Sequence, residues 1–294
     1  MAVSARPRRS VLYMPGARAR ALEKAKDLPA DALILDLEDA VTPSEKTTAR
    51  DLVATAVKDG GYGEREIIIR VNGADTEWGQ ADLAAAAAAG PDAILIPKVE
   101  NAAMLVEAAD AIAAHGAPET TAIWAMMETP TGILNAQEIA GAHPRLAGMV
   151  LGTNDLVKEL RASHQPGRAP VMTSLSIALL AARGAGLACI DGVYNAFKDD
   201  EGLRAECVQG RDMGFDGKTL IHPAQLAVTN EVFAPSPEAL AEAHEQLAAF
   251  EKVEAEGGGV AVVNGRIVEN LHVETARRLI AEAEAIARLA EAQM

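Results

Sequence analysis

The chain has 294 residues, of which 49% are hydrophobic and 3% aromatic, and its formal net charge is −15. This is enough apolar sequence for a large core, and the length suits a single barrel domain. The negative charge argues against nucleic acid as the main partner, because the surface would repel phosphates. No run of about 18 apolar residues is present and no signal-peptide pattern follows the first arginines, so we expect no membrane partner.

Only two cysteines occur, Cys189 and Cys207, and their spacing fits neither a disulfide framework nor a metal site. We therefore expect ordinary packing residues and a soluble protein in the reducing cytoplasm. The N-terminal 26 residues are basic, with seven Arg and Lys residues against Glu23 alone. This segment is suited to an anionic ligand, and a solvated basic face is the alternative.

Short apolar, β-rich runs alternate with helical segments along most of the chain. The predicted strands are Ser10–Tyr13, Ala32–Asp36, Glu66–Val71, Ala93–Pro97, Ala122–Met127, Leu146–Leu151, Ala188–Asp191 and Lys218–Ile221. Helical segments between them include Arg20–Leu28, Ser44–Lys58, Gln80–Ala89 and Ala102–His115. About eight such units, without a G-x-G-x-x-G fingerprint after the first strand, predict an α/β fold of the (β/α)₈ TIM-barrel type over residues 1–233.

After Pro235 the pattern changes. We predict a helix over Pro237–Ala255, a break at Gly257–Gly259, a hairpin over Val260–Val268 that turns at Asn264 and Gly265, and a helix over Val273–Met294. Residues 234–294 thus form a C-terminal helix-hairpin-helix extension. It is expected to close the active site, either of its own barrel or of a neighbouring subunit.

Polar residues follow the predicted strands, where the active site of a barrel lies. Glu128 and Asp155 each close an apolar run and together are suited to hold a hard divalent cation such as Mg²⁺, with Mn²⁺ as the alternative ion. Glu38 and Asp39 are expected just outside these ligands, and Asn154 beside the substrate. Crowded carboxylates are costly without a cation, which favours a metal.

Arg70 can grip a carboxylate through two parallel hydrogen bonds, which together with the metal suits a 2-oxo or 2-hydroxy acid. The alternative is that Arg70 neutralises Glu38 or Asp39. No G-x-S-x-G elbow or Ser-His-Asp order is present, which argues against a serine hydrolase. From spacing alone, His222 reads as a structural turn residue.

Ordered motifs along almost the whole chain resemble the citrate lyase beta subunit and malyl-CoA lyase group of the HpcH/HpaI aldolase superfamily. These motifs are Arg9–Gly16, Asp36–Val41, Arg70–Asn72, Pro97–Glu100, Glu128–Pro130, Gly152–Asp155 and Gly217–Pro223. The resemblance implies Glu128 and Asp155 as Mg²⁺ ligands and Arg70 as the residue that binds the acyl or oxo-acid carboxylate. It also implies a homotrimer or homohexamer whose C-terminal segment closes the next subunit's site.

The same resemblance implies that coenzyme A, as part of the substrate, contacts the basic N-terminal region and the loop after the eighth strand. The matching positions are Tyr13, Arg18, Lys24, Ile221 and His222.

The chain departs from the group at one position. Lyases of the group carry an Asp in a Gly-x-x-Val-Asp pattern of the tail, whereas this chain has Glu269 after Val268. The carboxylate is retained but moved by one methylene, and a displacement near 1 Å can cost about 10²-fold when proton transfer is strict. The tail around Glu269, with Asp191–Phe197 and Gly210–Lys218, resembles the thioester-hydrolysing branch of the group.

The resemblance therefore predicts Mg²⁺-dependent hydrolysis of (3S)-malyl-CoA to (S)-malate and CoA, with Glu269 as the base for the attacking water. The main alternative is a lyase that splits malyl-CoA, methylmalyl-CoA or citramalyl-CoA into an acyl-CoA and glyoxylate or pyruvate. A CoA-independent aldolase would leave Arg18 and Lys24 without a ligand. A non-enzymatic barrel would make the carboxylate cluster accidental.

Overall fold

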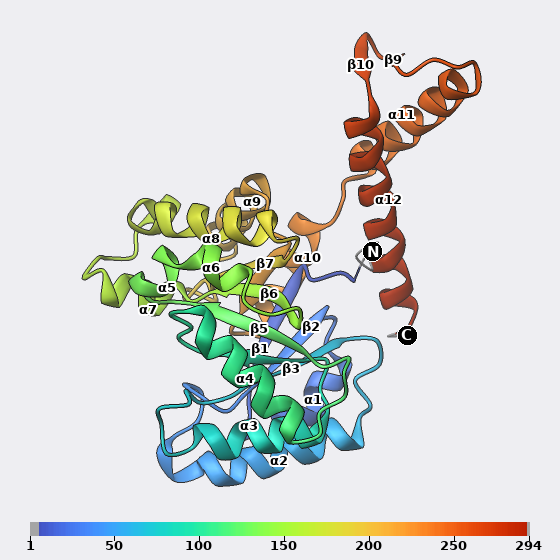
Figure 1. Ribbon diagram of the computed structural model, residues 1–294. Coiled ribbons are helices and arrows are strands. Elements are labelled where there is room, and N and C mark those ends of the chain that lie inside the picture. Colours follow the sequence, from blue (N-terminus) through green and yellow to red (C-terminus); the bar gives the residue numbers. More distant parts are fainter. Residues whose placement is uncertain (1–5, 293–294) are drawn as a thin grey trace. The chain divides into compact units, whose positions relative to one another are not determined.

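The computed structural model describes residues 6–292 (Figure 1). The chain divides into two units, and each is described by itself. Arg8–Phe233 form the first unit, and residues 234–292 with residues 6 and 7 form the second. No helix within residues 6–292 is long and apolar enough to cross a membrane.

In the first unit, eight parallel strands close into a barrel in the order β1 to β8. The strands are β1 Ser10–Pro15, β2 Ala32–Asp36, β3 Glu66–Arg70, β4 Ala93–Ile96, β5 Ala122–Met127, β6 Leu146–Leu151, β7 Ala188–Asp191 and β8 Gly217–Leu220. All eight predicted strands are present, four with the predicted ends and four with ends that differ by one or two residues, so the predicted TIM barrel is confirmed.

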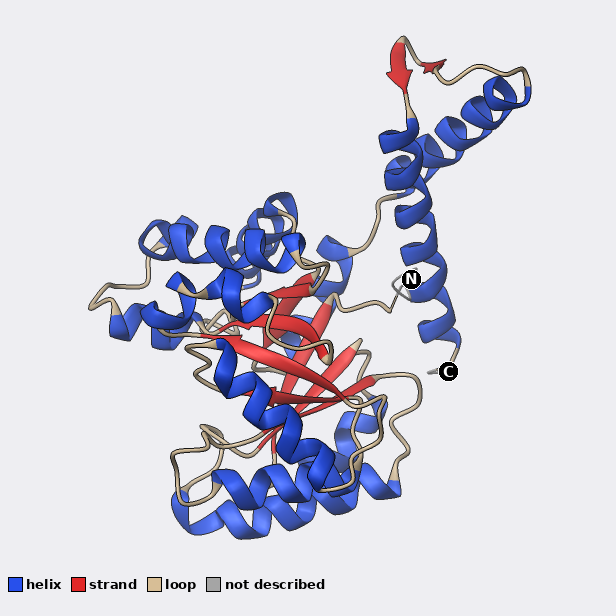
Figure 2. Cartoon of the chain, viewed as in Figure 1, coloured by secondary structure: helices blue, strands red, loops and turns tan. Residues whose placement is uncertain are grey.

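Helices surround the strands (Figure 2). They are α1 Ala19–Lys24, α2 Lys46–Asp59, α3 Gly79–Ala89, α4 Ala102–Ala114, α5 Pro130–Leu134, α6 Ala136–Ala140, α7 Thr153–Glu159, α8 Met172–Gly184, α9 Asp200–Met213 and α10 Leu226–Phe233. Short 3₁₀ turns occupy η1 Ala25–Asp27, η2 Pro43–Glu45, η3 Pro166–Val171 and η4 Pro223–Gln225. The helix predicted to reach Leu28 tightens into η1, because Leu28 is extended ahead of Pro29, as a residue before proline prefers.

Alternate residues of the strands form two separate cores. Side chains such as Val11, Ile34, Ile68, Trp124 and Ile190 fill the barrel interior. Their neighbours along each strand pack outward against the helices in a larger cluster, which includes both buried cysteines as packing residues. Strands buried on both faces explain why the sequence shows continuous apolar runs rather than alternation.

The second unit contains α11 Pro237–Ala255, an antiparallel pair of β9 Ala261–Val263 and β10 Arg266–Val268, and α12 Asn270–Glu291. The hairpin turns at Asn264 and Gly265, which have φ of 51° and 76°, as a two-residue turn of the predicted kind requires. The predicted helix-hairpin-helix is present. Helix α12 begins three residues before Val273, because Glu269 caps a polar first turn that the apolar pattern does not reveal. Its predicted last residues, 293 and 294, lie outside the described residues.

Candidate functional site

The carboxyl ends of β1 to β5 bring four predicted or neighbouring polar residues to one mouth of the barrel. Tyr13, Asp36, Arg70 and Glu128 each lie two positions after an interior residue of their strand, so alternation turns their side chains inward. Asp36, Arg70 and Glu128 are almost fully buried. Arg70 and Glu128 thus lie at the barrel end where the predicted strand ends put them, and Tyr13 and Asp36 lie beside them.

Arg70 is surrounded by carboxylates. Its Nε and Nη2 donate to the two oxygens of Asp36 at 2.6 and 2.7 Å, and its Nη1 lies 2.7 Å from Glu38 Oε2 and 3.6 Å from Asp39 Oδ2. Asp36 and Arg70 are register partners on β2 and β3. Burial acts to raise the pKa of Asp36, but Arg70 and the N–H groups of Glu38 and Ala40 hold it below its usual range. The guanidinium of Arg70 thus binds a carboxylate of the protein itself, Asp36, through two parallel hydrogen bonds.

Tyr13 and Arg70 stack at the same mouth. The guanidinium carbon of Arg70 lies 4.9 Å from the centre of the Tyr13 ring, a cation–π distance. Burial raises the pKa of the Tyr13 phenol, against the lowering effect of Arg70. Tyr13 therefore remains a neutral ring at physiological pH and forms one wall around the arginine.

Lys98 is a further cation of the mouth. Its Nζ lies 2.8 Å from Glu38 Oε1, so Glu38 bridges Lys98 and Arg70. Its backbone N–H donates to Glu128 Oε1 at 2.8 Å, and its φ is 48°, which is unusual for a residue other than glycine. Lys98 directly follows the predicted strand Ala93–Pro97, but strand alternation does not reveal this left-handed turn toward Glu128.

Glu128 is a buried carboxyl with negative neighbours. Burial raises its pKa to about 8, and the charges of Glu38 and Asp155 act in the same direction, while the Lys98 N–H and Arg70 act against them. Glycine at position 152 leaves room for the Glu128 side chain, because a Cβ on residue 152 would come 2.5 Å from Glu128 Oε2. The Glu128 carboxyl thus packs against a glycine, in surroundings that favour an added positive charge.

Asp155 lies in the first turn of α7, directly after β6, and is partly buried. Its neighbour Asn154 is exposed and exchanges two side-chain hydrogen bonds with Asn195, at 3.2 and 2.8 Å. The Asn154–Asn195 pair therefore ties the loops after β6 and β7 together beside Asp155.

The donor set fits a hard cation held by few protein ligands. Among residues 6–292, no group of three or more His, Cys, Asp or Glu side chains is arranged to hold a metal ion, which argues against a closed metal cage there. Two carboxylates that leave most positions to water and substrate oxygens are normal for Mg²⁺. The burial of the Glu128 carboxyl next to the charges of Glu38 and Asp155 indicates that a cation suits this place.

The residues predicted to contact coenzyme A lie on exposed parts of the barrel unit, apart from Tyr13. Arg18 precedes α1 and pairs with Glu45 at 2.7 Å, and Lys24 is exposed in the last turn of α1. Ile221 is 42% exposed. His222 begins η4 and stacks on Phe197, with 4.5 Å between ring centroids. Phe197 ends the Asp191–Phe197 stretch that resembles the thioester-hydrolysing branch, but it is not among the predicted site residues.

Glu269 belongs to the second unit, where it is the N-cap of α12 and its backbone N–H donates to His272 Nδ1 at 3.1 Å. Its carboxylate is exposed.

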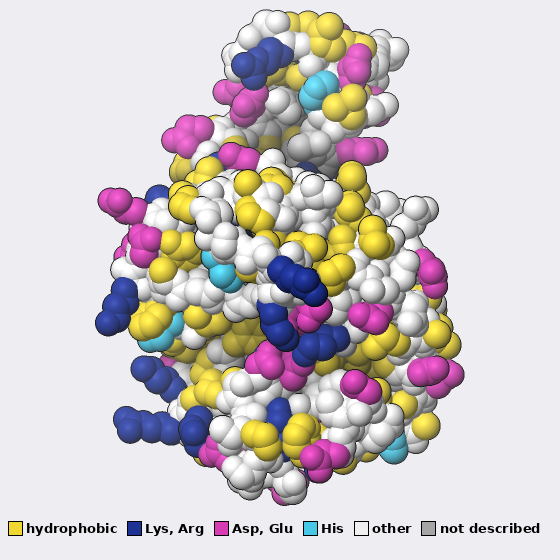
Figure 3. All heavy atoms as spheres, turned by 90° about the vertical axis from the view of Figure 1, so that its left-hand side faces the viewer, with side chains coloured by type: hydrophobic (Ala, Val, Ile, Leu, Met, Phe, Trp, Pro, Cys, Tyr) yellow, Lys and Arg dark blue, Asp and Glu magenta, His cyan; other side chains and the backbone are white. Residues whose placement is uncertain are grey.

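Figure 3 shows the face on which basic and acidic side chains of the protein gather next to one another, as expected for a surface whose charges pair locally.

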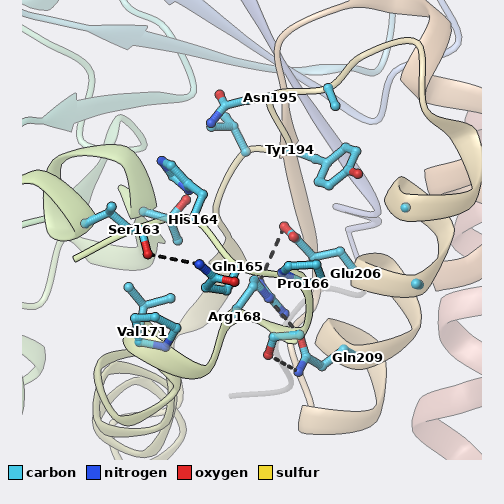
Figure 4. A pocket seen from close by; sticks show the side chains of 18 of the residues that line it. Ser163, His164, Gln165, Pro166, Arg168, Val171, Tyr194, Asn195, Glu206 and Gln209 are labelled. Atoms are coloured by element: carbon cyan, nitrogen blue, oxygen red, sulfur yellow. Dashed lines mark hydrogen bonds and ion pairs between the residues drawn. The ribbon is translucent and has the colours of Figure 1, made fainter.

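A cavity of about 570 Å³ lies beside the Asn154–Asn195 pair and is lined by the loops after β6 and β7, η3 and α9. Arg168, Glu206 and Gln209 meet at its floor (Figure 4). Arg168 Nη1 contacts both oxygens of Asp191, and Lys218 Nζ contacts Asp191 and Glu206 at 3.0 and 2.6 Å. Neither Arg70 nor Glu128 lines this cavity, so we place the chemistry at the barrel mouth and not here.

Comparisons with known proteins agree with this geometry. Residues 9–223 match the HpcH/HpaI aldolase/citrate lyase family. The chain is 61% identical over 287 residues to (3S)-malyl-CoA thioesterase from Cereibacter sphaeroides, with 98% of each protein covered. It is 37% identical over 284 residues to citrate lyase subunit beta from Escherichia coli strain K12, covering 95% of this chain and 94% of that protein.

A solved structure of protein CitE from Mycobacterium tuberculosis, in complex with magnesium, acetoacetate and coenzyme A, superimposes with a TM-score of 0.77 at 30% identity. The match covers 96% of this chain and all of that one. The matched residues thus include both the barrel and most of the C-terminal unit. The resemblance read from the motifs is confirmed, and this chain belongs to the HpcH/HpaI aldolase/citrate lyase family.

Proposed function

We propose that the protein hydrolyses (3S)-malyl-CoA to (S)-malate and CoA in a Mg²⁺-dependent reaction. The observation that carries this proposal is the 61% identity to (3S)-malyl-CoA thioesterase over 98% of both proteins. Arg70, Glu128, Asp155 and Glu269, the residues to which we assign roles in this reaction, are all present.

Glu128 and Asp155 would hold the metal, and Mn²⁺ is expected to be accepted by the same oxygen ligands. When bound, the ion supplies a positive charge that fixes the carboxylate and hydroxyl of the acyl group. The buried Glu128 with its raised pKa supports this assignment, as does the magnesium in the Mycobacterium tuberculosis complex. Glu38 and Asp39 would stay outside the ligand shell, because Arg70 contacts both.

Arg70 would orient the acid end of the substrate through its charge, held rigid by Asp36 and by the Tyr13 ring. Asn154 would form part of the rim through its bonds to Asn195. Arg18 and Lys24 are exposed cations suited to the phosphates of coenzyme A. The exposed pair Ile221 and His222 offers apolar and aromatic surface to the same ligand, and Tyr13 would face the reacting end of the chain.

In hydrolysis, a water oxygen attacks the thioester carbonyl carbon, the C–S bond breaks, and CoA leaves with the sulfur. We propose Glu269 as the group that takes the proton of this water. In this proposal the protein is a homotrimer or homohexamer, and the extension over residues 234–294 closes a site, with Glu269 supplied by a neighbouring subunit. The exposure of the Glu269 carboxylate in its own unit supports a partner outside that unit.

The second candidate is C–C cleavage to acetyl-CoA and glyoxylate, or to related acyl-CoA and oxo-acid products. The 37% identity to citrate lyase subunit beta favours keeping it, since the metal carboxylates suit both reactions. To decide, purified protein is incubated with Mg²⁺ and (3S)-malyl-CoA, and malate, CoA, acetyl-CoA and glyoxylate are quantified together. Malate and CoA in equal amounts support hydrolysis; acetyl-CoA with glyoxylate supports cleavage. EDTA should abolish either reaction, and added Mg²⁺ should restore it.

A further inference from the structure

The barrel mouth holds one cation that the proposed mechanism does not use. Lys98 follows β4, between Arg70 at the end of β3 and Glu128 after β5. Its side chain is 48% exposed, whereas the side chain of Arg70 is 8% exposed. Arg70 and Lys98 therefore differ in what they can offer to an incoming ligand.

Arg70 is already occupied. Two of its nitrogens bind Asp36 at 2.6 and 2.7 Å, a third lies 2.7 Å from Glu38, and one face of its guanidinium covers the Tyr13 ring. The edge of Arg70 at Nε and Nη2 is therefore taken by Asp36, and its other edge, at Nη1, already lies beside Glu38 in a side chain that is only 8% exposed. The internal ion pairs thus leave Arg70 fewer open positions for an incoming ligand than Lys98 has.

Lys98 is held differently. Its ammonium lies 2.8 Å from Glu38 Oε1, and a half-exposed ion pair of this kind contributes little to stability. If the ammonium moves away, Glu38 keeps Arg70 at its other oxygen. A substrate carboxylate can therefore replace Glu38 as the partner of the Lys98 ammonium at a small cost in free energy, and no buried charge is left unpaired.

The backbone also fixes Lys98 relative to Glu128. Lys98 has a left-handed φ of 48°, and its N–H donates to Glu128 Oε1 at 2.8 Å. The backbone of Lys98 is therefore hydrogen-bonded to a proposed metal ligand. Such a conformation costs of order 1 kcal/mol or more for a residue with a side chain and persists where its surroundings demand it. The lysine thus stands at a fixed place beside the metal carboxylates.

We propose that Lys98 is a substrate-binding residue whose ammonium leaves Glu38 and pairs with the carboxylate of the hydroxy-acid end of the substrate. The Glu38 carboxylate, which binds the ammonium in the structure, is the group that the substrate carboxylate would replace. The inference rests on the proposed function for the identity of the substrate. It goes beyond it by naming a second cation, beside Arg70, that recognises the acid end.

The test compares two thioesters that differ at one group. (3S)-Malyl-CoA carries a carboxylate where 3-hydroxybutyryl-CoA carries a methyl group. For Lys98→Met we expect kcat/KM for malyl-CoA to fall about 10- to 100-fold, mainly through KM, as for loss of a charge-assisted hydrogen bond. Hydrolysis of 3-hydroxybutyryl-CoA should change less than about threefold, so that the preference for the acid collapses.

Lys98→Arg should restore part of the preference, and Lys158→Met, which removes an exposed lysine of α7, should leave both rates unchanged. Thermal unfolding confirms that each variant is folded. Equal losses on both thioesters would mean that Lys98 only supports the fold, and unchanged rates would mean that it does not contact the acid; either result overturns the inference.

A binding measurement separates this inference from the proposed hydrolysis. Calorimetry with free (S)-malate and Mg²⁺ should show wild-type binding that weakens at least about tenfold in Lys98→Met, whether or not the thioester is hydrolysed. Equal affinities, or no binding to either protein, would contradict the role of Lys98. Absence of thioester hydrolysis with an intact affinity difference would contradict only the proposed function.

Discussion

Single residues at the barrel mouth set the geometry of the proposed site, and Gly152 shows how closely they pack. It follows β6, and an added Cβ would meet the side chain of Glu128, coming 2.5 Å from Oε2. The glycine is therefore required for close approach, not for backbone freedom.

For Gly152→Ala we expect Glu128 to be displaced and Mg²⁺-dependent turnover to fall about 100-fold, as for a 1 Å misplacement. The measurement is kcat at saturating Mg²⁺ together with the melting temperature. Gly184→Ala is the matched control, because nothing lies within 4 Å of a Cβ there and its melting temperature and turnover should stay near wild type. Full activity in Gly152→Ala would remove Glu128 from the metal site.

The raised pKa of Glu128 predicts a pH dependence whose sign is set by burial. Without metal, the folded protein keeps a proton on Glu128 that the unfolded chain loses above about 4.5. The contribution of Glu128 to the free energy of unfolding is therefore most favourable at low pH and declines as the pH rises from about 4.5 to about 8. Mg²⁺ must displace the proton, so its binding strengthens toward pH 8 and then levels off.

We accordingly predict that a fixed Mg²⁺ concentration raises the melting temperature more at pH 8.5 than at pH 6.5. Differential scanning fluorimetry with and without EDTA measures this. In Glu128→Gln the gain from Mg²⁺ should disappear at both pH values. A gain that is equal at the two pH values in the wild type would show that Glu128 is ionised throughout.

At the scale of elements, buried ion pairs join the segments that frame the mouth. Asp191 ends β7, contacts Arg168 of η3 through both oxygens, and contacts Lys218 of β8, which also binds Glu206 of α9. Asp191 and Lys218 are fully buried. Four elements thus depend on one carboxylate.

Asp191→Asn should lower the free energy of unfolding by about 3 to 5 kcal/mol, because two buried cations lose a shared counter-ion. Urea unfolding measures this change. Asp212→Asn, at an exposed carboxylate 62% accessible, should change it by less than about 0.5 kcal/mol. Similar small changes in both variants would mean that Glu206 alone neutralises the pair.

The strands were predictable from sequence, because strands buried on both faces appear as short apolar runs bounded by helical segments. The mouth residues followed from the strand ends. The pairing within the mouth was not predictable: Arg70 meets Asp36 because β2 and β3 pair in that register, and Lys98 reaches Glu38 only through its left-handed backbone. A residue pattern contains neither register nor φ. The alternative that Arg70 neutralises Glu38 or Asp39 could be stated from sequence, but the pairing of Lys98 with Glu38 could not.

At the scale of the whole molecule, the proposed assembly gives a mixing experiment. If Glu269 acts on a neighbouring subunit's barrel, Glu269→Gln and Arg70→Met are each inactive, but mixed oligomers contain some sites with both natural residues. Random assembly of equal amounts should restore about a quarter of the wild-type activity. Activity after co-expression, measured against each variant alone, is the readout. No recovery in isolated mixed oligomers would place Glu269 and Arg70 on the same chain or remove Glu269 from the reaction.

Attack of water on the thioester is the step that separates hydrolysis from C–C cleavage. The most direct measurement is mass spectrometry of the products formed from (3S)-malyl-CoA with Mg²⁺ in ¹⁸O-labelled water. We predict free CoA and malate in equal amounts, with one ¹⁸O atom in the malate carboxyl group that had formed the thioester. Acetyl-CoA and glyoxylate, without labelled malate, would contradict hydrolysis and identify the protein as a lyase.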